Sequence, residues 1–422
     1  MAIKLSEHWS ESSPSESVLH GIRVLDCSQL VAGPAAGAYL ADLGAEVLKI
    51  EMPGQGDLMR GFKTILGANT GLPQGRQVIV EYYNRNKKSV TIDLHKEAGQ
   101  RLMYELVEKS DVFVSNLLPQ ALREFKVDYP TLSKYNPKLI YTSTNVFGLK
   151  GPDADAPGFD IITQARSGLM TSSGQEGMPP VVVTSGVIDG LVGLLCAYGT
   201  LVALIGRDKL GIGQEVQVSQ LGGVMGTIIS VPLIQELLAG ERCGRPNLKK
   251  PMNPLFNWYK CKDDRWIVFN CVGDRGRWWH TICEAFGIQD LEHDSRFANE
   301  PKRIENSQAL AEILEKVIVD KSFEEWDALI RQSGEAFPYS VAGDISDLVN
   351  DPQVLANDYI LDLDHPIFGK IKFPAYPVYF SETPAAVRSI APEVGQNTEE
   401  VLIDILGYDW DRIIKLKDEG AI

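Results

Sequence analysis

One acidic residue, Asp189, lies near the start of a long apolar segment, TSGVIDGLVGLLCAYGTLVALIG at residues 184–206. A carboxylate in an apolar environment costs several kcal/mol unless other groups compensate its charge. If Gly186 caps a helix here, Asp189 is the third helical residue and meets free backbone N–H groups. Such an anion could cap the helix, or it could serve as a nucleophilic carboxylate. The residue pattern leaves both alternatives open.

A second acid, Asp160, follows the Pro-Gly pair of PGFDIITQARSG, where a helix is expected to begin. Acids at a helix start offset the helix dipole, so the pattern favours a capping role. No histidine falls between residues 96 and 279, around these two acids. This argues against a Ser-His-Asp hydrolase on this half of the chain, unless a later histidine folds back. The metal-binding spacing HExxH is also missing, and we predict no metal site.

A basic stretch, NRNKKSVTIDL, places Arg85, Lys87 and Lys88 before an expected strand. Three cations in an acidic chain suggest an anionic ligand, although charge alone favours a solvated face. A glycine turn in LVAGPAAGAYLADLG could bind phosphate at a helix start, or it could be a tight turn without a ligand. Only Gly33 and Gly37 of a GxGxxG pattern are present. A nicotinamide dehydrogenase therefore remains a weak alternative.

The composition of the chain limits which partners and which cellular location we expect. The chain has 422 residues and a formal net charge of −15, which argues against a nucleic-acid partner. Its six cysteines form no CxxC pair, so we expect reduced thiols and a cytoplasmic location. The first 21 residues lack the apolar core of a signal peptide. Residues 186–206 are long enough to span a membrane, but five glycines and an acid favour a buried core helix.

The first half of the chain alternates strand and helix patterns, which predicts an α/β fold with a parallel, Rossmann-like sheet. Expected strands cover residues 21–28, 45–51, 88–94, 111–117 and 138–148. A tryptophan-rich region of mixed patterns follows, and it predicts a smaller α+β domain. We therefore predict a large domain at residues 1–225, a linker and small domain at 226–345, and a return to the large domain at 346–422.

Several segments together resemble the class III coenzyme A transferases, the family of formyl-CoA and carnitine CoA-transferases. The resemblance is continuous from about residue 20 to 225 and looser beyond. Its segments are GIRVLDCSQLVAGPAAGAYLADLGAEVLKIEMPGQGDLMRG, NRNKKSVTIDL, DVFVSNLLPQAL, NPKLIYTSTNVFGLKGP, PGFDIITQARSGLM, VTSGVIDGLVGLLCAYGTLVAL and GIGQEVQVSQL.

The resemblance implies that Asp189 is the nucleophile, which attacks an acyl-CoA thioester and forms a covalent aspartyl intermediate. A CoA thioester is then a substrate, and no cofactor is permanently bound. The resemblance also implies an interlocked homodimer. The sequence leaves open whether a paralogous subunit replaces one copy, and we predict no membrane partner. The positions that match the family's CoA site are Gln29, Leu30, Val31, Ala32, Ile92, Asn116 and Leu117.

The sequence also departs from the family pattern. Met52, Glu124 and His95 stand where relatives carry basic residues that hold CoA phosphates, and we expect Arg60, Arg85 or Lys87 to compensate. His95 keeps its place in the predicted CoA site.

The substrate pocket is predicted to include Phe62, Phe159 and Asp160, with Val31, Phe62 and Phe159 replacing polar or larger groups. The stretch PMNPLFNWY stands where oxalate-specific members carry a glycine-rich flap. We therefore predict a bulky or aromatic acceptor acid, with succinyl-CoA as donor. The related α-methylacyl-CoA racemases carry histidine where Phe159 stands, which favours a transferase over this second alternative.

Overall fold

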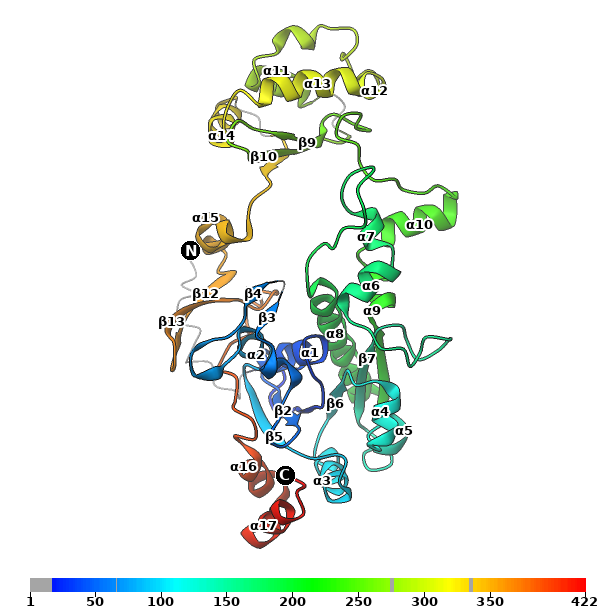
Figure 1. Ribbon diagram of the computed structural model, residues 1–422, viewed down its shortest axis with the longest axis vertical. Helices are drawn as coiled ribbons and strands as arrows, with labels where there is room; N and C mark the ends of the chain where they lie inside the picture. Colours follow the sequence, from blue (N-terminus) through cyan, green and yellow to red (C-terminus); the bar gives the residue numbers. More distant parts are fainter. Residues whose placement is uncertain (1–16, 66, 274–276, 334–336) are drawn as a thin grey trace. The chain divides into compact units, whose positions relative to one another are not determined.

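The structure is a computed structural model that describes residues 17–65, 67–273, 277–333 and 337–422 (Figure 1). The chain divides into two compact units. The first contains the described residues up to Met170 together with Val182–Glu241 and Ala356–Ile422, and the second contains Thr171–Val181 and Arg242–Leu355. The longer part of the second unit begins at residue 242, within the stretch 226–345 that was predicted to hold the linker and the small domain, and the unit also takes in Thr171–Val181.

A six-stranded sheet forms the centre of the first unit, and its strand order is β5-β2-β1-β6-β7-β8. Every neighbouring pair of strands is parallel, which confirms the predicted α/β class. The strands are β1 (Arg23–Asp26), β2 (Glu46–Glu51), β5 (Lys87–Thr91), β6 (Val112–Ser115), β7 (Ile140–Asn145) and β8 (Gln214–Ser219).

The strand order has a switch point between β1 and β6. From β1 the chain adds β2 and β5 on one side, and it then adds β6, β7 and β8 on the other. Ligands of open parallel sheets bind beyond the carboxyl ends of the strands at such a point. The turn that follows β1 and the turn that follows β6 therefore form the expected ligand crevice.

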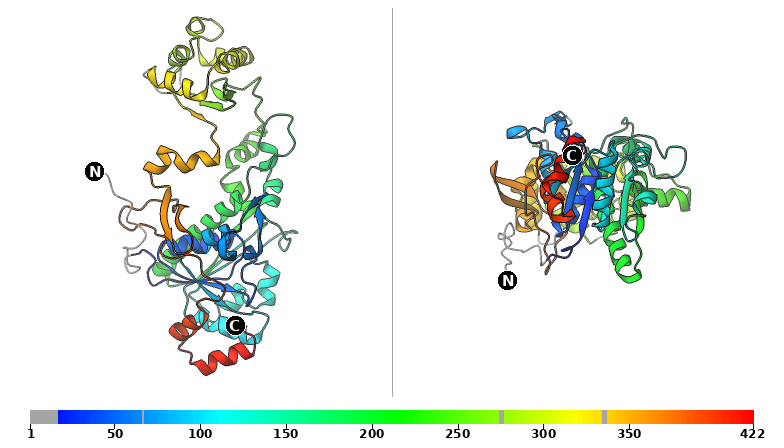
Figure 2. Two further views of the ribbon diagram at one scale, coloured as in Figure 1. Left: turned by 60° about the vertical axis from the view of Figure 1, so that its left-hand side comes forward. Right: turned by 90° about the horizontal axis from the view of Figure 1, so that it is seen from below.

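Helices cover both faces of the sheet, because successive strand residues point to opposite faces. Val24 of β1 packs in a core with helices α1 (Ala32–Asp42) and α8 (Val187–Leu210). Its neighbour Leu25 packs in a second core with α3 (Glu97–Glu108), α16 (Thr398–Leu406) and α17 (Trp410–Asp418). Helix α16 contacts α3 directly, and the left view of Figure 2 shows the carboxyl-terminal helices in red at the lower end of the molecule.

Helix α8 carries the apolar segment that contains Asp189. It has the length and hydropathy of a membrane span, and 44% of its most apolar window is buried in the structure. It packs on α1, β7 and β8, as expected for a core helix. Gly193 permits this contact, because an added Cβ would lie 2.6 Å from the Cβ of Ala35. One face of α8 stays exposed, with Tyr198, Val202 and Ile205 on it.

The second unit has its own core around an antiparallel sheet of three strands, β9 (Phe256–Lys260), β10 (Trp266–Asn270) and β11 (Tyr339–Val341). The core includes Trp279 and Trp326, which are buried, so the tryptophan-rich region forms a separate α+β layer. Its helices are α11 (Trp279–Ala285), α12 (Glu300–Glu305), α13 (Ser307–Ile318) and α14 (Phe323–Gln332), with the 3-10 helices η4 (Gln289–Glu292) and η5 (Ile345–Asn350).

The remaining elements are short. They are η2 (Leu58–Gly61), β3 (Thr64–Ile65), β4 (Ala68–Asn69), η3 (Pro73–Gly75), α2 (Val78–Tyr83), α4 (Pro119–Glu124), α5 (Tyr129–Leu132), α6 (Asp160–Arg166), α7 (Leu169–Ser172), α9 (Gln220–Gly226), α10 (Ser230–Ala239), α15 (Pro352–Ala356), and the hairpin of β12 (Ile360–His365) and β13 (Gly369–Pro374).

Candidate active site

Asp189 is the third residue of α8, as the sequence predicted. Gly186 precedes the helix with φ 77°, in the left-handed region that glycine tolerates best. Two of the free N–H groups at this helix end are satisfied by another acid. The backbone N–H of Ile188 donates to Oδ2 of Asp160 at 2.7 Å, and that of Asp189 donates to the same atom at 3.2 Å. Asp160 therefore caps α8.

The position of Asp160 corrects the expectation that it caps its own helix. It is the first residue of α6, and it reaches across to α8, 28 residues away. Gln164, one turn later in α6, donates through Nε2 to Oδ1 of Asp160 at 2.5 Å and to the carbonyl of Thr184 at 2.7 Å. The Gln164 amide oxygen accepts from the N–H of Val183 at 3.0 Å. This network fixes the segment that leads into α8.

The Asp189 carboxylate has a separate partner. Gln220, at the start of α9, donates through Nε2 to Oδ1 of Asp189 at 2.7 Å. The hydroxyl of Thr163 donates to the amide oxygen of Gln220 at 2.6 Å. Gln220 and Thr163 were not predicted from the sequence, because nothing in the local pattern links three segments so far apart in the chain.

Burial raises the pKa of Asp189 to about 7, and the negative charge of Asp160 adds to this effect. A carboxylate with a raised pKa is a stronger base and nucleophile than an ordinary one, and a fraction of it stays ionised near neutral pH. Tyr83 of α2 lies in the same environment; burial raises its pKa, and the charges of Tyr39, Tyr82 and Asp189 add to the shift. Asp189 is thus a carboxyl group with a raised pKa at the edge of an apolar core.

The predicted CoA residues of the first turn lie at the switch point of the sheet. The N–H of Gln29 donates to Oδ1 of Asn116 at 2.8 Å, and Nδ2 of Asn116 donates back to the carbonyl of Gln29 at 2.6 Å. Leu30 has φ 67°, an unfavourable value for leucine, and its N–H donates to Oδ1 of Asp57 at 2.9 Å. Val31 and Ala32 follow and are buried at the start of α1.

The other predicted CoA residues are more scattered. Leu117 follows Asn116 and packs partly into the core beneath the sheet. Ile92 is buried just after β5. His95 is exposed, and its Nδ1 lies 2.9 Å from Oδ1 of Asp93. Its ring meets the edge of Phe125, with centroids 4.9 Å apart.

The three cations expected to hold CoA phosphates lie in internal ion pairs. Arg60 donates to Glu51 through Nε at 2.8 Å and through Nη2 at 2.9 Å. Arg85 is buried against Asp42, with Nη2 and Oδ2 2.5 Å apart. The sequence left open whether this basic stretch binds an anionic ligand or faces solvent. In the structure the Arg85 side chain is buried in an ion pair with Asp42.

Lys87 belongs to a buried chain of charges beneath the first turn. Its Nζ lies 2.7 Å from Oδ2 of Asp26, and both side chains are fully buried. Lys49 lies 3.8 Å from Asp26 and 3.0 Å from Asp57, which holds the strained backbone of Leu30. Burial lowers the pKa of Lys87 to about 8, although the Asp26 charge opposes this. Lys87 therefore helps to stabilise the turn that follows β1.

The predicted pocket residues differ in exposure. Phe159 is 65% exposed and Phe62 is 44% exposed, whereas Asp160 is buried as the cap of α8. The stretch PMNPLFNWY lies in the second unit, where Leu255 and Tyr259 are buried in the core of that unit. Those two residues are therefore core residues of the second unit.

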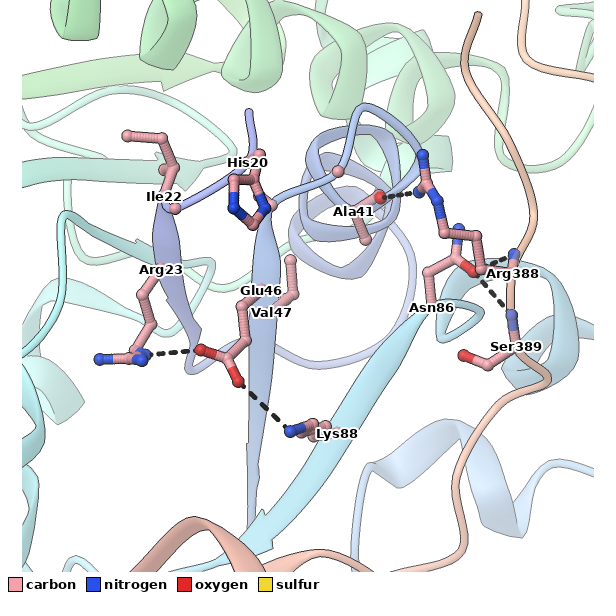
Figure 3. Close-up of a pocket in the computed structure, with 13 residues that line it drawn as sticks. His20, Ile22, Arg23, Ala41, Glu46, Val47, Asn86, Lys88, Arg388 and Ser389 are labelled. Carbon is pink, nitrogen blue, oxygen red and sulfur yellow. Dashed lines mark hydrogen bonds and ion pairs between the residues drawn. The ribbon is translucent and has the colours of Figure 1, made fainter. Parts of the chain in front are cut away.

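A cavity of about 360 Å³ opens at the amino ends of β1 and β2, at the opposite edge of the sheet (Figure 3). Arg23 pairs with Glu46 at 2.8 Å, and Lys88 lies 3.3 Å from the same carboxylate. The cavity lies at the edge of the sheet opposite to the first turn, and Asp189 is not among the residues that line it. Among the residues that the structure describes, no group of three or more His, Cys, Asp or Glu side chains is placed to hold a metal ion.

Comparison with known proteins identifies the family. The model of CoA-transferase family III matches residues 19–398. The chain belongs to this family. It is therefore an enzyme of the CoA-transferase type, whose substrates are CoA thioesters and carboxylic acids.

Relatives agree with this assignment over nearly the whole chain. A cinnamoyl-CoA:phenyllactate CoA-transferase of Clostridium sporogenes is 31% identical, over 96% of this chain and 97% of its own. A succinyl-CoA:glutarate CoA-transferase of Mus musculus is 30% identical, over 96% of this chain and 90% of its own. A crystal structure of a CAIB/BAIF family protein from Brucella suis has a TM-score of 0.80 and 26% identity, and covers 92% of this chain and 100% of that one.

Proposed function

We propose that this family III enzyme transfers CoA from an acyl-CoA to a free carboxylic acid through a covalent intermediate on Asp189. The observation that carries the proposal is that Asp160 and Asp189 have different roles at the start of α8. Asp160 caps α8 by accepting from two of its free N–H groups, so the Asp189 carboxylate is not needed as a cap. A costly half-buried carboxylate without a structural duty is typical of a reacting group.

The chemistry follows from the properties of a carboxylate nucleophile. Attack of Asp189 on the thioester gives a mixed anhydride and releases CoA thiolate. The anhydride stays activated, so the thioester free energy is conserved as long as water is excluded. The apolar surroundings that raise the pKa of Asp189 also disfavour water.

Transfer is favoured over exchange of an α-proton. A racemase needs a proton-transfer group on each face of the α-carbon. Phe159, which stands beside Asp160, has no titratable group. Asp189 alone cannot serve both faces.

For the substrates, we propose a bulky or aromatic acceptor acid and succinyl-CoA as donor. Phe62 and Phe159 leave ring surface exposed in the unit that carries Asp189. Burial of an aromatic substrate ring there contributes about 25 cal/mol for each Å² of apolar surface. One relative is named for phenyllactate and another for succinyl-CoA, which supports both choices.

A dimer is part of the proposal. The exposed apolar residues Tyr198, Val202 and Ile205 form one stripe on α8. Exposure of such an apolar surface to water is unfavourable, and contiguous apolar patches often mark protein–protein interfaces. We propose that a second subunit covers it, either an identical copy or a paralogue, in an interlocked arrangement. A cytoplasmic location stays a prediction.

The test is a kinetic panel of acyl-CoA donors and free acids, followed by mass spectrometry. We expect ping-pong kinetics, a preference for aryl-substituted acids over oxalate or formate, and no activity in Asp189→Ala. Full activity of that variant would contradict the proposal. Solvent deuterium at the α-carbon of an acyl-CoA, without an acceptor acid, would point to the racemase instead.

A further inference from the structure

The two oxygens of Asp189 have different surroundings. Oδ1 accepts the hydrogen bond from Nε2 of Gln220 at 2.7 Å. Of the residues that the structure describes, none donates a hydrogen bond to Oδ2. One oxygen is therefore held by the protein, and the other is available to a substrate.

The orientation of the Gln220 amide is determined by its two neighbours. An ionised carboxylate can only accept hydrogen bonds, so the NH₂ group must face Asp189. The amide oxygen then accepts from the hydroxyl of Thr163 at 2.6 Å. Thr163 is fully buried and Gln220 is 6% exposed, so solvent does not compete strongly for either contact.

The backbone also fixes Gln220 in place. It follows directly on β8, whose last residue pairs with the end of β7, and it begins α9. Ser219 caps this short helix through a hydrogen bond from the N–H of Gly222 at 3.0 Å. Helix α9 packs on both α6 and α8, the helices that carry Thr163 and Asp189 (Figure 1).

We propose that Gln220 is a catalytic residue that selects Oδ2 of Asp189 as the attacking atom and stabilises the negative charge that develops on Oδ1. This inference rests on the proposed function and adds a donor for the charged intermediates of that reaction. A donor that already points at the atom where charge develops requires no reorganisation during the reaction.

The reaction can be followed atom by atom. Oδ2 attacks the thioester carbonyl carbon, the carbon–sulfur bond breaks, and CoA leaves as a thiolate. The thiolate attacks Cγ of Asp189, and the electron pair of the Cγ–Oδ1 double bond moves onto Oδ1. Collapse of this adduct breaks the Cγ–Oδ2 bond, and the donor acid leaves as a carboxylate that carries Oδ2 away. The product is a thioester between CoA and Asp189, which retains Oδ1.

The second half repeats these steps in reverse. An oxygen of the acceptor carboxylate attacks Cγ, Oδ1 again takes the charge, and CoA thiolate leaves. The thiolate then attacks the carbonyl carbon of the acceptor, and Asp189 departs as a carboxylate with Oδ1 and one oxygen from the acceptor. No oxidant, reductant or net proton is needed. Each turnover thus replaces one oxygen of Asp189 and retains the other.

The experiment supplies an acceptor acid labelled with oxygen-18 and measures the label on Asp189 in a peptide digest after many turnovers. The wild-type enzyme should hold one heavy oxygen on Asp189, because Gln220 and Thr163 prevent the two oxygens from exchanging places. Gln220→Met should hold two, and its kcat should fall about 100- to 1,000-fold. Gln217→Met makes the same chemical change at an exposed position of β8 and should behave as the wild type.

The outcomes separate the two proposals. No label on Asp189 in an active wild-type enzyme would overturn the proposed covalent function itself. Two heavy oxygens in the wild type, or a Gln220→Met enzyme with unchanged kcat and a single label, would overturn only the role of Gln220. If Gln220→Met fails to fold, Gln220→Glu retains the shape and replaces the donor with an acceptor. The same loss of kcat is expected for it above neutral pH, and wild-type kcat would contradict the inference.

Discussion

Replacement of Asp189 by asparagine should stabilise the protein while it removes activity. The pKa of Asp189 rises from 3.8 to about 7 in the folded state, first through burial and then through the charge of Asp160. This difference corresponds to at most about 4 kcal/mol against the ionised form in the folded chain. Asparagine removes the charge and can still accept the hydrogen bond of Gln220 through its amide oxygen. We therefore expect Asp189→Asn to gain about 1–4 kcal/mol at pH 8.

The gain should depend on pH in one direction. An acid with a raised folded-state pKa binds its proton more tightly in the folded chain than in the unfolded chain. Its contribution to stability is therefore complete below about pH 4 and is lost as the pH rises through about 7. The difference between Asp189→Asn and the wild type should be largest at pH 8 and should shrink toward pH 4.

Urea unfolding at pH 4, 6 and 8, followed by circular dichroism, measures this difference. Asp208→Asn is a matched control, because Asp208 lies near the other end of α8 with its side chain 76% exposed. Its effect should stay within about 0.5 kcal/mol at each pH. An Asp189→Asn variant that is no more stable than the wild type at pH 8 would refute the assignment of Asp189 as a strained, half-buried carboxylate.

Three further predictions concern packing and assembly. Lys87→Met should cost about 3–5 kcal/mol of stability and raise the KM for acyl-CoA, because the buried Asp26 then keeps only Lys49, 3.8 Å away, as a charge partner beneath the first turn. Lys88→Met should change either quantity little, and equal effects of the two variants would contradict this. Gly193→Ala should lower the melting temperature through a clash with α1, at a cost of about 1–3 kcal/mol of stability. Gly190→Ala is the control, because an added Cβ there meets no atom within 4 Å, and an equal loss of stability in both variants would contradict this prediction. Val202→Glu should dissociate the proposed dimer in sedimentation velocity, and an unchanged sedimentation coefficient would show that the exposed stripe of α8 is not the interface.

Local patterns in the sequence predicted the elements better than they predicted the contacts between them. Alternating strands and helices gave the parallel sheet, and a glycine before an apolar run placed Asp189 at the third position of its helix. These features depend on neighbours in the sequence, which a pattern records directly.

The contacts between segments far apart in the chain could not be predicted from the sequence. Asp160 looked like a cap for its own helix, yet it caps a helix that begins 27 residues later. Arg85 and Lys87 read as a basic patch, because a sequence does not show that Asp42 and Asp26 lie beside them in the core. Gln220 carried no signal at all, since a single glutamine after a strand is common.

The central claim is a covalent bond to Asp189, and trapping with hydroxylamine tests it most directly. The enzyme is incubated with succinyl-CoA, treated with hydroxylamine, digested and analysed by mass spectrometry. We predict a hydroxamate on Asp189 that forms only when the acyl-CoA is present and that is absent from Asp189→Asn. An enzyme that turns over under these conditions and yields no modified Asp189, or carries the hydroxamate on another residue, would contradict the account.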